Sequence, residues 1–214
     1  MNIENVESFI MYNYSHMGKT SIIRQLILVT FFVMLDIVVW RIMGIVNNMF
    51  WPITLMIYAT WSIFLLLIRK VSLQMRFIYE GFSFSLLAVL FLAETAKILF
   101  ISNNSMYLFS LILILASVSC IVAIKMCRHR ITVGYDRIVS QGKNLTIVST
   151  LGAIAGIWFT RIFFAQASQS TIINVIFMIL IVTSLLSSFS ACICFYKVYL
   201  IMKYSLNLDV NDQR

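Results

Sequence analysis

The chain has few charged residues and few residues that interrupt helices. Of its 214 residues, 11% are charged, 61% are hydrophobic and only one is a proline. Soluble domains carry about 25% charged residues, so a soluble globule of this size could not cover its surface with so few charges. The abundance of large apolar side chains also excludes a disordered chain. The composition therefore indicates an integral membrane protein.

The sequence also lacks the motifs that indicate catalysis. It contains no Gly-x-Ser-x-Gly, no His-Glu-x-x-His and no glycine loop that would cradle a phosphate. Its two histidines, His16 and His129, fall outside the apolar segments, so no segment pairs a serine with a histidine. Membrane hydrolases and transferases need such clusters to stabilise charge where water is scarce. We therefore expect no enzyme activity, no cofactor and no metal site.

Six apolar segments are long enough to cross a bilayer. A helix rises about 1.5 Å per residue, so roughly 20 apolar residues cross a hydrocarbon core of about 30 Å. Runs such as 175–182 (VIFMILIV) are apolar at every position, which excludes the alternation of a transmembrane barrel. The sequence predicts an all-α membrane protein, a six-transmembrane-helix bundle with spans over residues 26–46, 49–68, 82–101, 106–124, 145–166 and 171–196.

The basic residues predict how this bundle is oriented. The three turns on one side, near residues 47–48, 102–105 and 168–170, contain no lysine or arginine. The other side holds Lys19, Arg24, Arg69, Lys70, Arg76, Lys125, Arg128, Arg130, Arg137, Lys143, Lys197, Lys203 and Arg214. Cytoplasmic segments of membrane proteins are enriched in these residues. Both termini are therefore predicted to be cytoplasmic, in a multi-pass protein of the plasma membrane.

Three regions follow from these spans. Residues 1–25 form a cytoplasmic or interfacial segment, residues 26–202 the transmembrane domain, and residues 203–214 a cytoplasmic tail. In the first region, apolar residues recur at three- or four-residue spacing: Ile3, Val6, Ile10, Tyr14 and Met17. This periodicity over residues 3–17 predicts a short amphipathic helix at the cytoplasmic interface.

Ionisable residues inside the predicted spans form a polar belt, consisting of Asp36, Arg41, Glu94, Lys97 and Arg161. A charge within a span is costly, so such residues indicate either pairing or function. One interpretation is a set of interhelix salt bridges that pin the bundle. The other is a polar cavity, open to the outside, that binds a ligand or passes an ion. Asp36 is the best single residue for that role, because its short side chain cannot snorkel to water.

A basic surface is predicted between the fourth and fifth spans. It consists of Lys125, Arg128, Arg130, Arg137 and Lys143, against the single acid Asp136. Anionic headgroups of the inner leaflet would hold such a surface at the bilayer. The alternative occupant is a cytosolic partner such as an ATPase.

Small residues on the fifth span predict close helix packing. Gly152 and Gly156 form a Gly-x-x-x-Gly pair, which lets two backbones approach without lipid between them. Packing within the bundle and a homo-oligomer contact are both compatible with this pair. The cysteines, which all lie in the predicted cytoplasmic half, are expected to be free thiols; they are Cys120, Cys127, Cys192 and Cys194.

Two functional hypotheses follow. The first is a transport-type, permease-like subunit that binds or moves an ion or amphiphilic peptide through the polar belt. Since the sequence has no ATP-binding motif, active transport would need a cytosolic ATPase or other membrane subunit. The second is an immunity or accessory protein that protects against a membrane-active toxin or peptide. Neither involves nucleic acid. In general architecture, the predicted bundle resembles small membrane subunits of peptide exporters, although these often have larger outer segments.

Overall fold

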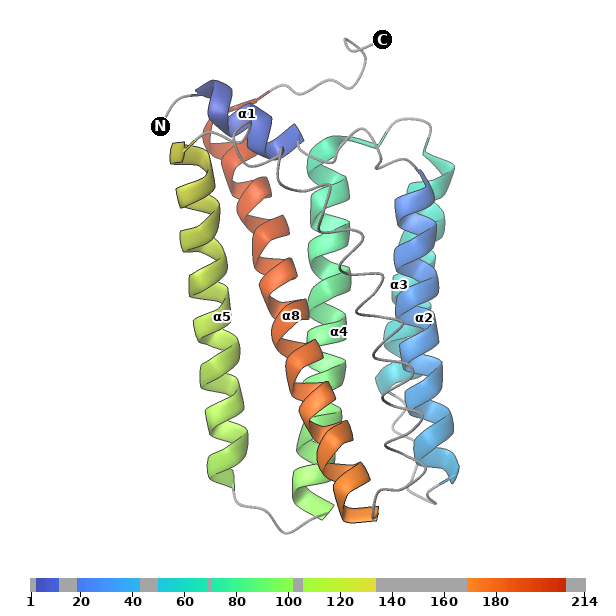
Figure 1. The fold of residues 1–214 in the computed structure, drawn as a ribbon. Coiled ribbons are helices and arrows are strands. Elements are labelled where there is room, and N and C mark those ends of the chain that lie inside the picture. The colour runs from blue at the N-terminus through green and yellow to red at the C-terminus, as the bar shows by residue number, and fades with distance from the viewer. Residues whose placement is uncertain are drawn as a thin grey trace, which may run out of the picture.

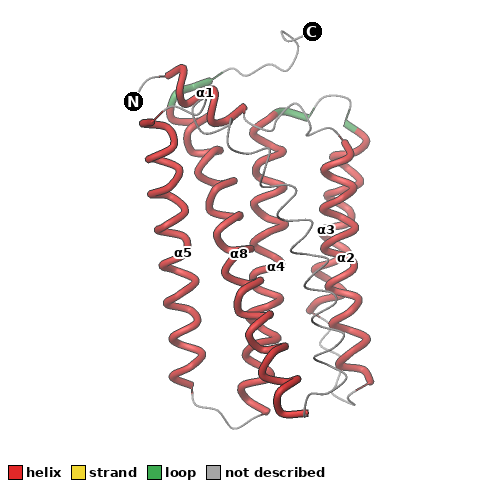
Figure 2. Tube along the Cα trace, viewed as in Figure 1, coloured by secondary structure: helices red, strands yellow, loops and turns green. Residues whose placement is uncertain are grey.

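All regular secondary structure in the described residues is helical. The computed structural model describes residues 3–11, 19–42, 50–68, 71–101, 106–133 and 169–206, and these ranges contain no strand (Figure 2). The helices are α1 (Ile3–Met11), α2 (Lys19–Ile42), α3 (Phe50–Leu67), α4 (Leu73–Ile101), α5 (Met106–Val133) and α8 (Gln169–Lys203). The all-helical prediction is confirmed for this part of the chain.

Three of these helices are long and apolar enough to cross a membrane. Their candidate spans are Leu73–Lys97 in α4, Tyr107–Val133 in α5 and Asn174–Lys203 in α8. Two shorter apolar stretches, Ile22–Met34 and Trp51–Leu67, lie in α2 and α3. The predicted span 145–166 lies outside the described residues. Helix length and composition in the described ranges therefore support a membrane protein.

Several helices extend past the spans that hydropathy predicted. α4 begins at Leu73 rather than at residue 82, α5 ends at Val133 rather than at 124, and α8 ends at Lys203 rather than at 196. Hydropathy locates only the stretch that suits hydrocarbon, whereas a helix continues for as long as its backbone hydrogen bonds can be made. Residues predicted to lie in links are consequently helical: Arg76, Glu80, Lys125, Arg128 and Arg130.

The long helices alternate in direction, and α1 lies across one end of them (Figure 1). The end carrying α1, here called the α1 end, also holds the first turns of α2 and α4 and the last turns of α3, α5 and α8. α4 is central, because it packs against α8, α2 and α5, while α3 pairs with α2. About 56% of the α4 span is buried, against 11% of the α5 span, so α5 lies at the periphery.

Small residues bring α4 and α8 together. On α8, six of the buried residues alternate between three- and four-residue spacing, which forms one stripe along the helix: Ser184, Ser187, Ala191, Cys194, Val198 and Ile201. On α4, a Cβ added to Gly81 would lie 3.1 Å from the Phe195 ring and 3.3 Å from the Cβ of Cys194. The backbones therefore approach closely, which is the main source of helix association in lipid.

The short helix α1 packs onto the α1 end of the bundle. Its side chains Val6, Phe9 and Ile10 are buried. They belong to a cluster, here called the cap cluster, with residues of α4, α5 and α8, namely Leu73, Phe77, Cys127, Ile131, Val198, Leu200 and Ile201. The predicted N-terminal helix is thus found over Ile3–Met11, while residues 12–18 lie outside the described part. Its apolar face contacts protein, and Phe9, which the predicted pattern did not include, is one of its buried anchors.

Candidate functional site

The described structure covers part of the predicted polar belt. Glu94 and Lys97 lie on α4. Asp36 and Arg41 belong to α2, but their side chains lie outside the described residues. The same holds for all of Arg137, Lys143, Gly152, Gly156 and Arg161.

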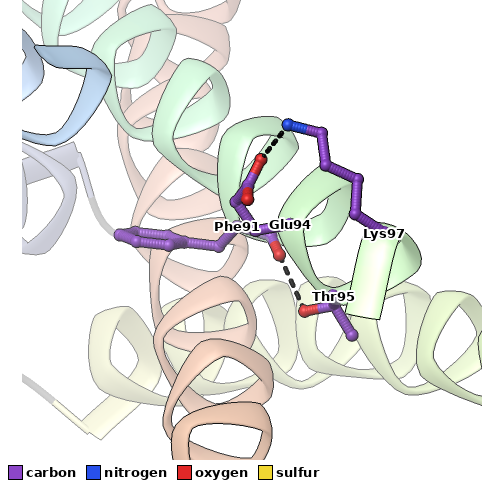
Figure 3. A network of polar contacts seen from close by, with 4 residues as sticks. All are labelled: Phe91, Glu94, Thr95 and Lys97. Carbon is purple, nitrogen blue, oxygen red and sulfur yellow. Dashed lines mark hydrogen bonds and ion pairs between the residues drawn. The ribbon is translucent and has the colours of Figure 1, made fainter. Parts of the chain in front are cut away.

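Glu94 and Lys97 form an ion pair within one helix. The Lys97 Nζ lies 2.5 Å from the Glu94 Oε1, and the two side chains are 30% and 13% exposed, respectively (Figure 3). Beside the pair, the buried hydroxyl of Thr95 donates to the Phe91 carbonyl at 2.7 Å. Partners three residues apart on a helix face each other, so this ion pair lies within α4.

Three of the five residues of the predicted basic surface lie within the described part of the chain. Lys125 and Arg128 are exposed on the last turns of α5, and Arg130 is half-buried beside them. Lys203, at the end of α8, is exposed at the same end of the bundle. These side chains place positive charge around the α1 end.

Four hydroxyl groups that the sequence interpretation missed connect α3 to α4. The Tyr58 hydroxyl pairs with Ser83 Oγ at 2.6 Å, and the Tyr79 hydroxyl pairs with Ser62 Oγ at 2.8 Å. All four side chains are fully buried. The two phenol rings also stack, with their centroids 5.4 Å apart. Each tyrosine therefore contacts the serine on the other helix.

The directions of these hydrogen bonds follow from counting protons. Ser62 Oγ donates to the Tyr58 carbonyl, and Ser83 Oγ donates to the Tyr79 carbonyl, both at 2.7 Å. A serine has one proton to donate, so with that proton on the carbonyl each serine oxygen accepts from the tyrosine opposite. The single proton of Tyr79 is shared between Ser62 at 2.8 Å and the Ile22 carbonyl at 3.5 Å. The four hydroxyls form a reciprocal set, here called the hydroxyl ring, in which every proton is used. A buried polar group without a partner is costly, and this set avoids that cost.

A buried lysine on α8 lies beneath α1. Lys197 is 8% exposed, and its Nζ donates to the carbonyl of Ile10, at the end of α1, over 3.4 Å. The same ammonium lies 5.3 Å from the ring centroid of Phe9 and 4.8 Å from that of Phe77. Glu80 on α4 is also buried and interacts electrostatically with Lys197. α1 thus closes over a buried cation at the α1 end.

The contacts of Lys197 do not fully replace water. An ammonium has three donors, and among the described residues it has one hydrogen bond, which is long. Each cation–π contact is worth about 0.5–2 kcal/mol. The penalty for removing an ammonium from water is several kcal/mol. These contacts replace only part of the hydration that the ammonium loses, so the Lys197 charge does not stabilise the closed arrangement.

The sequence interpretation missed Glu80 and Lys197 because both fall just outside the predicted spans. A charge outside a span carries no burial cost that would mark it as functional. A repeated pattern could have revealed the hydroxyl ring. Tyr-x-x-x-Ser occurs in two consecutive apolar segments, at 58–62 and at 79–83. That spacing places the serine hydroxyl over the carbonyl of its own tyrosine on a helix.

The cysteines are free thiols in the structure, as predicted, with Cys127 and Cys194 buried and Cys120 and Cys192 partly exposed. Cys120 Sγ lies 3.8 Å from the Ser188 carbonyl, which links α5 to α8. Among the described residues, no group of three or more histidine, cysteine or acidic side chains could hold a metal ion.

No family model, curated protein or solved structure matches this chain.

Proposed function

We propose that this protein is a transport-type, permease-like subunit that binds or moves an ion or amphiphilic peptide across the plasma membrane, without enzyme activity of its own. The observation that carries the proposal is the placement of ionisable side chains on helices of membrane length. Glu94 and Lys97 lie toward one end of α4, and buried Glu80 lies toward the other, facing Lys197 on α8. Such residues in membrane helices commonly mark the pathway of a substrate or ion.

The orientation in this proposal is that of a six-span bundle with both termini in the cytoplasm. In support, basic side chains gather at the α1 end, where cytoplasmic residues are expected; they are Arg24, Arg76, Lys125, Arg128, Arg130, Lys197 and Lys203. Lys97, which is paired with Glu94, lies toward the opposite end. In this orientation, the α1 end faces the cytoplasm and the Glu94–Lys97 pair faces outward.

A cytosolic ATPase is the partner that this function requires for active transport. Lys125 and Arg128 project from the end of α5 into the surroundings, with Arg130 beside them. Exposed basic side chains at a cytoplasmic end suit an acidic protein surface as well as anionic headgroups. We propose that the ATPase binds these residues when transport is active.

Purification from native membranes tests this function. The full chain, extracted in mild detergent, should bring a nucleotide-binding protein with it. Changing Lys125→Gln together with Arg128→Gln should reduce the recovery of that protein, while the matched control Lys203→Gln should preserve it. Recovery of a toxin or toxin receptor in place of a nucleotide-binding protein would reject transport and support the immunity function.

A further inference from the structure

We propose that α1 is a releasable cap on the bundle, and that the charge on Lys197 keeps this cap from docking tightly. The proposal is independent of the transport function. It combines two observations at one place in the fold: the burial of three apolar side chains of α1 in the cap cluster, and the burial of a lysine ammonium by the same helix.

Docking gives α1 its helical structure. An isolated helix of nine residues is only marginally stable in water, because its nucleation is unfavourable. Val6, Phe9 and Ile10 stabilise α1 by packing against α4, α5 and α8. Ile3 and Glu4 are exposed, the remaining residues are partly exposed, and Met11 packs at the edge of the cap cluster. Only one face of this short helix therefore holds it in place.

The same docking places Lys197 in an unfavourable position. When α1 is docked, the Lys197 ammonium has lost most of its water and gained one long hydrogen bond to Ile10 and two aromatic contacts. Release of α1 would return this cation to water, because Phe9 and the Ile10 carbonyl would leave together. Glu80 interacts electrostatically with Lys197 in the docked state, and because it belongs to α4 it would not leave with α1.

The membrane interface can accommodate α1 after it is released. Its apolar face suits the boundary between headgroups and acyl chains, where an amphipathic helix buries such a face. Release therefore exchanges one apolar environment for another while it rehydrates Lys197. The docked and released states of α1 are therefore both populated, and the cap opens and closes over the ends of α4, α5 and α8.

Cys127 reports the state of the cap directly. It lies in the cap cluster beneath α1 and is 2% exposed. We would keep Cys127 as the single cysteine by combining Cys120→Ser, Cys192→Ser and Cys194→Ala. The full chain in mild detergent would then be treated with a polar maleimide, and the rate of modification measured. Working in detergent makes the measurement independent of membrane topology.

Three variants test the proposal. Phe9→Ala, which removes a buried anchor, should raise the modification rate at least tenfold. Ile3→Ala, on the exposed face of the same helix, should leave the rate unchanged. Lys197→Met, which keeps the length of the side chain and removes its charge, should lower the rate at least threefold. Misfolding would raise the rate rather than lower it. Because the Lys197 charge also interacts electrostatically with the Cys127 thiol, the rates are compared per thiolate, which the pH dependence of each rate gives.

Two results would overturn the proposal. If Lys197→Met raises the modification rate, the lysine holds α1 in place and its charge stabilises the docked state. If Phe9→Ala leaves the rate unchanged, α1 does not control access to Cys127. A cysteine introduced by Arg128→Cys, with Cys127→Ala, serves as the control, because it is exposed and should react equally fast with or without each change.

Discussion

The phenol rings of Tyr58 and Tyr79 stack with their planes 11° apart, and each ring carries a hydroxyl that pairs with a serine on the helix of the other. This relationship is reciprocal because α3 and α4 run in opposite directions and each carries the same Tyr-x-x-x-Ser spacing. The Tyr79 hydroxyl also lies 3.5 Å from the Ile22 carbonyl of α2. The Tyr79 side chain therefore contacts the backbone of α2 as well as Ser62 on α3.

The hydroxyl ring predicts which residues are energetically coupled. In a double-mutant cycle, Tyr79→Phe and Ser62→Ala should show a coupling energy of about 0.6–1.5 kcal/mol, the range for hydrogen bonds between membrane helices. Tyr58→Phe and Ser83→Ala should show a similar value. The free energy of unfolding in mixed detergent micelles is the quantity to measure.

The matched control for that cycle uses pairs on a single helix. Ser62 donates to the backbone carbonyl of Tyr58, which Tyr58→Phe leaves intact. Tyr58→Phe and Ser62→Ala should therefore couple less than either cross-helix pair, because these two hydroxyl groups exchange no direct hydrogen bond. Equal coupling in the same-helix and cross-helix pairs would show that the cross-helix hydroxyl pairs are not the source of the coupling.

Gly81→Ala should weaken the contact between α4 and α8. The new Cβ would meet the Phe195 ring at 3.1 Å and the Cβ of Cys194 at 3.3 Å. The ring is partly exposed and can rotate, whereas the Cβ of Cys194 moves only with its backbone. Overpacking costs about 1–3 kcal/mol, and the higher helix propensity of alanine returns about 1 kcal/mol. We expect a net loss of about 1 kcal/mol in the free energy of unfolding.

A second substitution distinguishes overpacking from a general effect at this position. In the Gly81→Ala background, Phe195→Ala removes the ring that the methyl group meets. The loss caused by Gly81→Ala should then be smaller than in the parent chain. If Gly81→Ala costs the same with and without the Phe195 ring, the ring is not the source of the strain.

The Glu94–Lys97 pair predicts an asymmetry between single substitutions. Glu94 is the more buried partner, so Lys97→Met should cost more than Glu94→Gln, because the first change removes a cation beside the more buried carboxylate. We expect Lys97→Met to cost about 1 kcal/mol and the double variant to regain most of that loss. Thermal unfolding of the three variants measures this. A double variant less stable than Lys97→Met would contradict the pairing.

Topology can be tested by fused reporters. A reporter that is active only outside the cytoplasm should be silent when fused after Arg214, and active when inserted between Asn103 and Asn104. The physical reason is the retention of basic segments on the cytoplasmic side. Activity after Arg214, or silence at the 103–104 position, would reverse the orientation of the proposed bundle.

Asp36 tests whether the polar belt is open to the outside. If it lines an external cavity, as the transport function requires, Asp36→Cys in a chain without other cysteines should be labelled by an impermeant thiol reagent added outside. The salt-bridge interpretation expects no labelling. It also expects Asp36→Ala to cost about 3–5 kcal/mol for a desolvated pair, with recovery when Arg41 or Arg161 is replaced as well.

Much of the described fold could be predicted from apolar length alone. The helices over α4, α5 and α8 follow from runs of apolar residues, which in hydrocarbon must satisfy their backbone groups internally. The ends of these helices could not be located this way, because the polar residues beyond the hydrocarbon continue the helix. This is why Glu80 and Lys197, expected outside the spans, are buried helical residues.

The candidate site was less predictable. Glu94 and Lys97 could be paired from their spacing, because residues three apart on a helix are neighbours. Lys197 gave no signal, since its burial depends on α1, which is distant in sequence and contacts it through Ile10 and Phe9. The partners of Tyr79 likewise come from other segments.

The sequence by itself determined that the chain forms helices long and apolar enough to cross a membrane, because apolar length and the need to satisfy backbone hydrogen bonds are properties of each segment taken alone. It also determined the amphipathic character of α1. Only the tertiary structure decided which helices meet. Close approach at Gly81, the crossed tyrosines and serines, and the burial of Lys197 beneath α1 each join residues from different helices. Such contacts depend on packing in three dimensions, which no single segment encodes.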